Sequence, residues 1–149
     1  MALDQEWQLK LVDLYYLEEE LKDVKDFQHN LKYLMLTNKI KKKADFYSVF
    51  KSKNFLNQRS FTIQYANRIN VSNVKEPRYG VIASKKVGNA VKRNYAKRRA
   101  RAMESIISSY GEKDIDYVLV IKKNFVNENF NKLNLNLKNA LIKIKKITE

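Results

Sequence analysis

Two apolar stretches separated by a long helical pattern constrain the fold of this 149-residue chain more than any other feature. Residues 79–84 (YGVIAS) and 117–122 (YVLVIK) predict strands, the second of them buried. Between them, Gly88 and Asn89 interrupt the chain, and one helix is expected from about residue 90 to residue 109. Such a strand–helix–strand unit crosses over right-handedly by default.

Shorter patterns on either side complete the element order. Residues 44–51 (ADFYSVFK) predict a short helix, which Asp45 can cap or favour through the helix dipole. Residues 60–66 alternate apolar and polar side chains with the period of a strand. A last helix is expected after Asn127 or Asn129. The apolar face of that helix comprises Phe130, Leu133, Leu137, Ala140, Leu141, Ile144 and Ile147. The order helix, two or three strands, helix, strand, helix predicts an α+β sandwich with helices on a small sheet.

The net charge of +14 points to polyanionic partners, nucleic acid before acidic membrane. Residues 1–34 hold eight acids and four lysines, which leaves +18 for residues 35–149. We therefore expect an acidic amphipathic helical extension over 1–34 and a basic RNA-binding domain over 35–149, with Met35 as a candidate natural start. The extension either packs on the domain or on another copy, or is not part of the working protein.

Several classes of function are disfavoured by composition. The chain has no cysteine, so it can form neither a disulfide nor a thiolate metal site. No apolar run approaches the roughly 20 residues of a membrane span, and the first residues lack a signal-peptide pattern. The one histidine, His29, is expected to be a surface residue of the extension. Asp114 and Asp116 could hold a hydrated magnesium ion, but a solvated turn is the favoured interpretation. We assign no catalytic side chain and expect a cytoplasmic protein without a membrane partner.

The helix after Gly88 sorts its side chains into two faces. At about 100° per residue, five polar groups share one arc of about 140°. They are Arg93, Asn94, Lys97, Arg98 and Arg101. Tyr95, Met103 and Ile106 belong to the opposite, apolar arc. No acid stands four residues from Arg93, Lys97 or Arg98, so the cations repel one another until a polyanion neutralises them. Arg99 does not fit this division, because it falls inside the apolar arc.

The same region carries a family pattern. Residues 84–91 read SKKVGNAV, and Arg93-Asn94, Lys97-Arg98 and Arg101 follow at fixed spacing. With Asp45-Phe46 and Val49-Phe50 upstream and Pro77-Arg78-x-Gly80 before the strand, this pattern resembles the bacterial ribonuclease P protein subunit over about residues 35–146. Residues 1–34 fall outside the resemblance.

The resemblance implies a fold and a function. The fold would be an αβββαβα sandwich with a small mixed sheet and an unusual left-handed βαβ crossover, like the second domain of ribosomal protein S5. The protein would be the basic cofactor of a ribozyme that removes the 5′ leader from precursor tRNA, in a 1:1 complex with the ribonuclease P RNA. The RNA would carry out the chemistry with bound Mg²⁺, and the protein alone would bind no cofactor.

The resemblance also implies two sets of site residues. The RNA subunit would be bound by Lys85, Lys86, Arg93, Asn94, Lys97, Arg98 and Arg101. A cleft for the single-stranded leader would be lined by the aromatic residues Phe46, Phe50, Phe61, Tyr65 and Tyr79. Stacking on aromatic rings next to cations is how unpaired RNA is commonly held.

Some residues depart from the family pattern. Tyr95 stands where an arginine is common, and Gln64 where some members have an aromatic cleft residue, while strict alternation turns Tyr65 to the other face. Glu104 replaces an apolar residue and is expected to face outward. Two alternatives remain: a non-catalytic, ribosomal-type structural RNA-binding protein, and an interaction module that dimerises through the acidic helix.

Overall fold

A five-stranded sheet in the order β1-β4-β5-β3-β2 forms the centre of the domain. The computed structural model describes residues 38–68 and 76–149, which belong to one compact unit. The predicted acidic helix, His29 and Met35 lie outside the described residues. The strands are β1 (Asn38–Lys39), β2 (Phe55–Asn57), β3 (Phe61–Asn67), β4 (Arg78–Ile82) and β5 (Ile115–Ile121). The helices are α3 (Lys43–Ser52), α4 (Ala90–Ala102), α5 (Glu104–Tyr110) and α6 (Phe130–Thr148), with short 3-10 helices η1 (Lys85–Val87) and η2 (Lys123–Val126).

The sheet is mixed. β5 pairs antiparallel with β3, from Phe61 opposite Ile121 to Asn67 opposite Ile115, and parallel with β4, where Gly80 stands opposite Val118. β1 runs parallel to β4, and β2 antiparallel to β3. The predicted α+β class with a small mixed sheet is therefore confirmed, while the left-handed crossover stays a prediction. β1 and β2 were not foreseen as separate strands, because two or three residues are too few to show an alternation.

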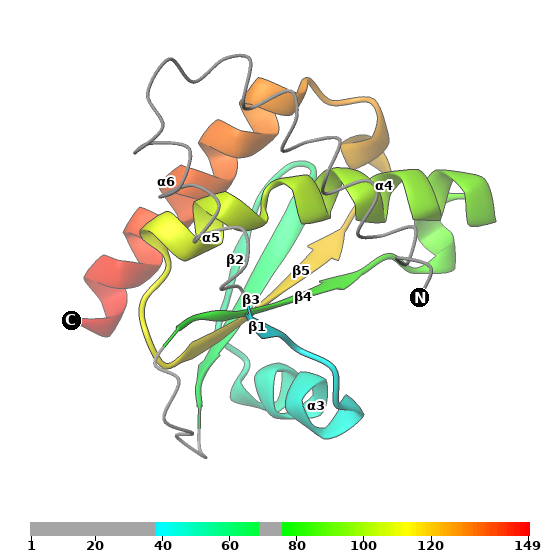
Figure 1. Cartoon of the computed structure of the whole chain (residues 1–149). Helices are drawn as coiled ribbons and strands as arrows, with labels where there is room; N and C mark the ends of the chain where they lie inside the picture. The colour runs from blue at the N-terminus through cyan, green and yellow to red at the C-terminus, as the bar shows by residue number, and fades with distance from the viewer. Residues whose placement is uncertain (1–37, 69–75) are drawn as a thin grey trace, which may run out of the picture. The chain divides into compact units, whose positions relative to one another are not determined.

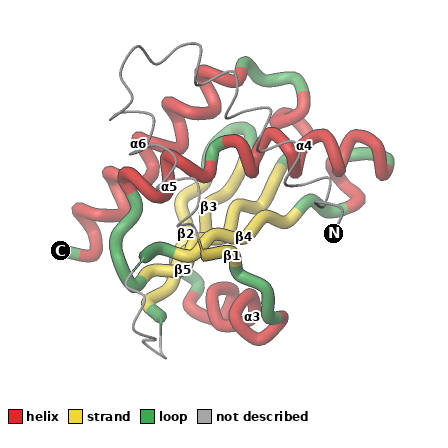
Figure 2. The backbone as a smooth tube through the Cα atoms, viewed as in Figure 1, coloured by secondary structure: helices red, strands yellow, loops and turns green. Residues whose placement is uncertain are grey.

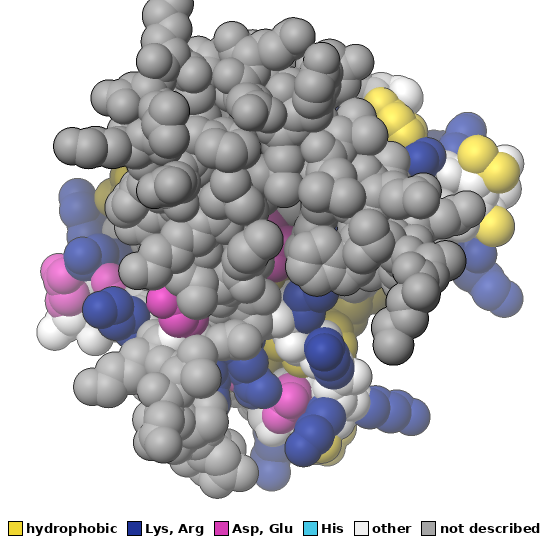
Figure 3. All heavy atoms as spheres, viewed as in Figure 1, with side chains coloured by type: hydrophobic (Ala, Val, Ile, Leu, Met, Phe, Trp, Pro, Cys, Tyr) yellow, Lys and Arg dark blue, Asp and Glu magenta, His cyan; other side chains and the backbone are white. Residues whose placement is uncertain are grey.

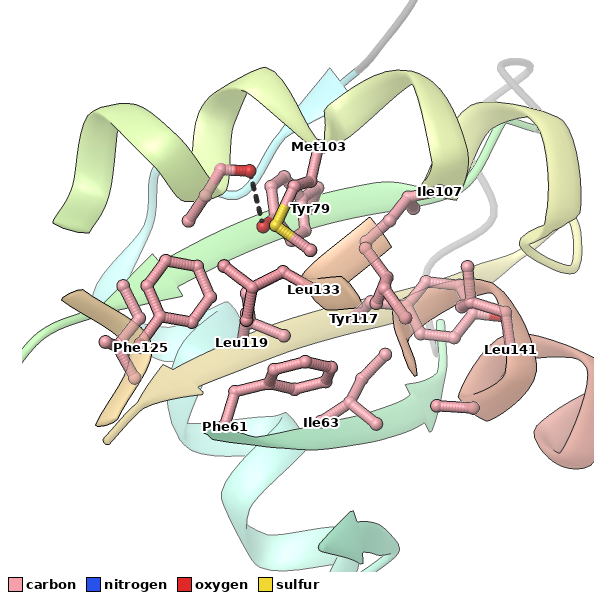
Figure 4. Packing of buried hydrophobic residues seen from close by; sticks show 14 of the residues in the cluster. Phe61, Ile63, Tyr79, Met103, Ile107, Tyr117, Leu119, Phe125, Leu133 and Leu141 are labelled. Atoms are coloured by element: carbon pink, nitrogen blue, oxygen red, sulfur yellow. Dashed lines mark hydrogen bonds between the residues drawn. The ribbon is translucent and has the colours of Figure 1, made fainter. Parts of the chain in front are cut away.

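Helices cover both faces of the sheet, because α3 lies on one side and α4, α5 and α6 lie on the other (Figures 1 and 2). The larger core lies between the sheet and the three helices. Phe61, Ile63, Tyr117 and Leu119 point into it from the strands, and Met103, Ile107, Leu133 and Leu141 meet them from the helices (Figure 4). The core under α3 is smaller, with Ile40, Val49, Ala66 and Val118 buried. Alternation along β3 and β5 supplies both cores.

The helical segment after Gly88 is two helices and not the single helix expected. Met103 separates α4 from α5, and its N–H donates to the carbonyl of Ala100 three residues back, at 3.1 Å. This tighter turn changes the phase of the side chains. Glu104, predicted to face outward, is consequently buried, and its Oε1 has no hydrogen-bond partner in the described part of the chain.

The last helix matches its prediction closely. Asn129 is the N-cap of α6, since its Oδ1 accepts from the N–H of Asn131 at 2.9 Å, so of the two candidate caps it is Asn129 that acts. Five of the seven apolar residues predicted for the inner face are buried, whereas Phe130 and Ile147 are 36% and 63% exposed. Across residues 38–68 and 76–149, we find no helix that has the length and apolar character needed to cross a membrane.

Candidate nucleic-acid interface

The start of α4 is fixed by two backbone-specific residues. Gly88 has φ of 146°, a conformation that side-chain-bearing residues rarely adopt, and its N–H donates to the carbonyl of Lys85 at 3.2 Å. Asn89 is the N-cap, because its Oδ1 accepts from the N–H of Lys92 at 2.9 Å. Lys85 and Lys86 are exposed on η1 immediately before this turn. Both lysines therefore lie immediately before the N-terminus of α4.

The five polar residues predicted for one face of α4 do share a face. Ala96 and Ala100, on the opposite face, are fully buried. The residues Asn94, Arg98 and Arg101 are exposed, while Arg93 and Lys97, which lie closer to the alanines, are partly buried. We call Arg93, Asn94, Lys97, Arg98 and Arg101 the basic face. Figure 3 shows Lys and Arg side chains beside hydrophobic ones at the right of the view, where α4 begins in Figure 1.

Three cations of the basic face, Arg93, Lys97 and Arg98, have no carboxylate partner among the described residues. The charged pairs there involve Arg68, Arg78, Lys132 and Lys145. Arg93 Nη1 donates instead to the carbonyl of Gly88 at 2.9 Å, which holds its side chain against the turn. Uncompensated cations on one helix face are an electrostatic footprint suited to a polyanion.

Arg99, the residue that did not fit the helix pattern, joins α4 to the segment before α6. Its Nη1 donates to the carbonyls of Phe125 and Val126 at 2.7 and 2.8 Å, and its Nη2 to the carbonyl of Glu128 at 2.5 Å. The guanidinium also lies 5.7–5.8 Å from the ring centroids of Tyr95, Phe125 and Phe130. Arg99 thus satisfies the carbonyls at the C-terminal end of η2. Tyr95, expected to anchor the apolar face, is 44% exposed and lies against this guanidinium instead.

Two of the five predicted leader-contacting aromatic residues belong to α3 and are partly exposed. Phe50 is 38% exposed, and Phe46 is half-buried. The ring of Phe46 lies directly on β4, because a Cβ built at Gly80 would stand 2.6 Å from Phe46 Cε1. The glycine of the Pro77-Arg78-x-Gly80 pattern therefore provides the space for this ring.

The other three aromatic residues belong to the core, and their assignment to a leader cleft has to be corrected. Phe61, Tyr65 and Tyr79 are 0%, 7% and 3% exposed, and all three point to the side of the sheet covered by α4, α5 and α6. Tyr79 donates its hydroxyl proton to the carbonyl of Ala100 at 3.0 Å, and burial raises the pKa of this phenol (Figure 4). Alternation along β3 put Phe61 and Tyr65 on one face correctly, but it could not say that the three-helix layer covers that face.

The side of the sheet that faces α3 offers a different set of groups. Thr62, Gln64, Ile82 and Val120 are partly buried there. Phe55 on β2 pairs with Gln64, so it shares this side, and it is 58% exposed. Phe55 could not be predicted from the sequence, because a three-residue strand gives too little pattern to orient its side chains. The only sequence signal was an aromatic residue two positions after Lys53.

A polar cluster attaches α3 to the sheet. Arg78 holds Asp116 through two bonds, Nε to Oδ1 at 2.7 Å and Nη2 to Oδ2 at 2.5 Å, and its Nη1 reaches Asp45 at 3.0 Å. Arg68 Nε donates to the same Asp116 at 3.2 Å. The hydrogen bond to Asp116 raises the pKa of Arg78, against the opposing effect of burial. Asp116 is therefore a buried structural partner within β5, which corrects the prediction of a solvated turn.

The described residues contain no group of three or more His, Cys, Asp or Glu side chains arranged to hold a metal ion. Lys and Arg side chains on α4 and aromatic rings beside α3 are the features that the domain presents instead. A mixed sheet layered between helices, with one cationic helix face, defines a small basic α+β protein.

The chain belongs to the ribonuclease P protein family. The family model for Ribonuclease P matches residues 34–145. The chain is 31% identical over 103 residues to the ribonuclease P protein component of Limosilactobacillus fermentum, covering 69% of this chain and 88% of that one. It is 32% identical over 107 residues to the same component of Streptococcus pyogenes, covering 70% and 84%.

A solved structure agrees with this assignment. The ribonuclease P protein of Staphylococcus aureus superposes with a TM-score of 0.60 at 27% identity, covering 76% of this chain and 99% of that one. The suspected family is therefore confirmed.

Proposed function

We propose that this protein is the subunit of ribonuclease P that binds the catalytic RNA and the 5′ leader of precursor tRNA, and so assists removal of the leader to give the mature 5′ end. The observation that carries the proposal is the basic face of α4 within a chain of this family. An endonuclease whose RNA subunit performs the cleavage needs cations and stacking surfaces from its protein, and those are the groups that this domain offers.

We assign binding of the RNA subunit to Lys85, Lys86 and the basic face. Arg98 is exposed and Arg93 is held against Gly88, so the first can adapt to a phosphate while the second has a fixed position. Arginine suits this task because its planar fork can bind phosphate through two parallel hydrogen bonds. Each phosphate neutralised releases counterions, so affinity is expected to fall steeply with salt.

We assign binding of the leader to the side of the sheet that faces α3. We call the partly exposed rings of Phe46, Phe50 and Phe55 the leader platform. Thr62 and Gln64 on β3 lie on the same side and can exchange hydrogen bonds with an unpaired base. Stacking tolerates every base, so this platform suits a leader of variable sequence.

The chemistry is assigned to the RNA. Magnesium ions bound by the RNA subunit would supply the activated water and stabilise the leaving oxygen. The protein's own residues neutralise phosphates and hold the unpaired leader beside the cleavage point, in a 1:1 complex in the cytoplasm. No side chain of the protein is assigned to proton transfer.

Reconstitution tests the proposal. The full chain is mixed with a bacterial ribonuclease P RNA and precursor tRNA at low Mg²⁺, and 5′ cleavage is measured. We expect faster cleavage than with RNA alone, and a gain that Arg98→Ala reduces. Lys143→Ala removes one exposed charge from α6 and is the matched control, expected to leave the rate unchanged. A rate equal to that of RNA alone, at salt that permits binding, would sink the proposal.

A ribosomal-type structural RNA-binding protein is the alternative, since a cationic helix face would serve it equally. The leader platform favours ribonuclease P, because a purely structural subunit has no need to distinguish a leader. The complex should therefore bind precursor tRNA more tightly than mature tRNA, and Phe50→Ala should narrow that difference. Equal affinities for both tRNAs would favour the alternative.

A further inference from the structure

Beside the basic face, α4 and α6 together present a half-exposed aromatic pair that no part of the proposed function uses. Tyr95 comes from α4 and Phe130 from the first turn of α6. They are 44% and 36% exposed, and the guanidinium of Arg99 lies 5.7 and 5.8 Å from their ring centroids. Residues 35 positions apart in sequence thus surround one fixed cation.

The cation in this pair is held in place by the fold. Among the described residues, the hydrogen bonds of Arg99 go to three backbone carbonyls, of Phe125, Val126 and Glu128, and none goes to a carboxylate. Its positive charge is therefore not cancelled by an acidic side chain there. Because three of its five N–H donors bond these carbonyls, the guanidinium has a fixed position beside the two rings, whose exposed surfaces are left to a further partner.

The surroundings of the pair decide what that partner is. On α4, Tyr95 follows Val91 by four residues and precedes Arg98 by three, so the three side chains are neighbours on the helix surface. Val91 and Arg98 are both exposed, Val91 by 76%. Lys92, three residues before Tyr95, is exposed as well. A partner protein would have to bury these unpaired cations, whereas an RNA strand would neutralise them and stack a base on the ring.

We propose that Tyr95 and Phe130, ordered by Arg99, form a stacking site for an unpaired nucleobase of the ribonuclease P RNA, next to the phosphate contacts of Arg98. The site lies at the edge of the basic face and is formed on the sheet side opposite to the leader platform, so it serves the RNA subunit and not the leader. This inference rests on the proposed function.

The salt dependence of RNA affinity distinguishes a stacked base from a phosphate contact. Affinity of the full chain for a fluorescently labelled ribonuclease P RNA is measured across a series of salt concentrations, for Tyr95→Leu, Tyr95→Phe, Phe130→Leu and Arg98→Ala. Loss of a stacked base weakens binding about tenfold at every salt concentration, because stacking releases no counterions. We therefore expect Tyr95→Leu to lower affinity about tenfold with an unchanged slope, and Tyr95→Phe to bind like the unmodified protein. Phe130→Leu should weaken binding in the same direction, and Arg98→Ala should reduce the slope by about one.

A matched control exists on α5. Tyr110 is 40% exposed and also has a cation beside its ring, with Lys138 Nζ at 4.7 Å from the centroid. Tyr110→Leu should bind RNA normally. Unchanged affinity in both Tyr95→Leu and Phe130→Leu would overturn the stacking site, as would an equal loss in Tyr110→Leu. If Arg98→Ala still lowers the slope in that case, the proposed function stands without the stacking site. If no variant changes affinity and the protein does not stimulate cleavage, the proposed function fails as well.

Discussion

Two consecutive arginines on α4 should differ sharply when each is replaced by methionine, which keeps the aliphatic stem. Arg99 makes three hydrogen bonds to carbonyls and three contacts with aromatic rings, whereas Arg98 is exposed and has no side-chain hydrogen bond or ion pair within the described residues. If each bond contributes about 1 kcal/mol, Arg99→Met lowers the free energy of unfolding by about 3 kcal/mol. The ring contacts would add a further contribution of about 0.5 kcal/mol each at partly exposed positions. Arg98→Met should change it by less than about 0.5 kcal/mol.

Urea denaturation of the two variants measures this difference. With a slope of about 2 kcal/mol per molar urea, the midpoint of Arg99→Met should fall by about 1.5 M from the hydrogen bonds alone and by about 2 M with the ring contacts, while that of Arg98→Met stays in place. Arg99→Lys keeps the charge but cannot bond three separated carbonyls, so it should lie between Arg99→Met and the unmodified protein. Equal midpoints for Arg98→Met and Arg99→Met would refute the structural role assigned to Arg99.

Three further substitutions test other contacts in the same structure. Asn89→Ala removes the N-cap of α4 and should lower the free energy of unfolding by about 1 kcal/mol; no change in thermal unfolding would contradict the capping role. Gly80→Ala forces the ring of Phe46 to move and should lower the free energy of unfolding by about 1–3 kcal/mol. Much of this loss should disappear in a Phe46→Leu background, and additive losses in a double-mutant cycle would show that the two sites do not touch. Burial raises the pKa of Tyr117 from 10.0 to about 12, so the stability present below pH 10 should decline between pH 10 and 12, because the unfolded phenol ionises first. Tyr117→Phe should flatten that decline, and an unchanged pH profile would exclude Tyr117 as its source.

The strongly periodic features could be predicted from the sequence, because their pattern arises within one element. The angles of Arg93, Lys97 and Arg98 on a helix, and the inner face of α6, depend only on the 3.6-residue period. The break at Met103 could not be predicted, since neither glycine nor proline marks it. The burial of Glu104 was missed for the same reason.

Other outcomes depended on partners far away in sequence. Arg99 seemed misplaced because the carbonyls that it bonds lie 26 to 29 residues later. Alternation along β3 grouped Phe61 with Tyr65, but which side of the sheet receives the larger helical layer is decided by α4, α5 and α6 together. Asp116 was predicted to lie in a solvated turn, because its partners Arg68 and Arg78 come from other segments of the chain. Properties set by tertiary packing are outside the reach of a local pattern.

The unequal sizes of the two cores give the domain a rigid side and a compliant side. The helical layer of α4, α5 and α6 shares a large buried core with the sheet, whereas α3 is attached through a few apolar contacts and the polar cluster around Arg78. A layer with so little buried apolar surface opens at a lower free energy than the rest of the domain. The basic face therefore belongs to the more firmly held layer, and α3 to the layer that opens more readily. Under the function proposed above, the firm layer would meet one folded RNA, and the compliant layer would accommodate leaders of different sequence.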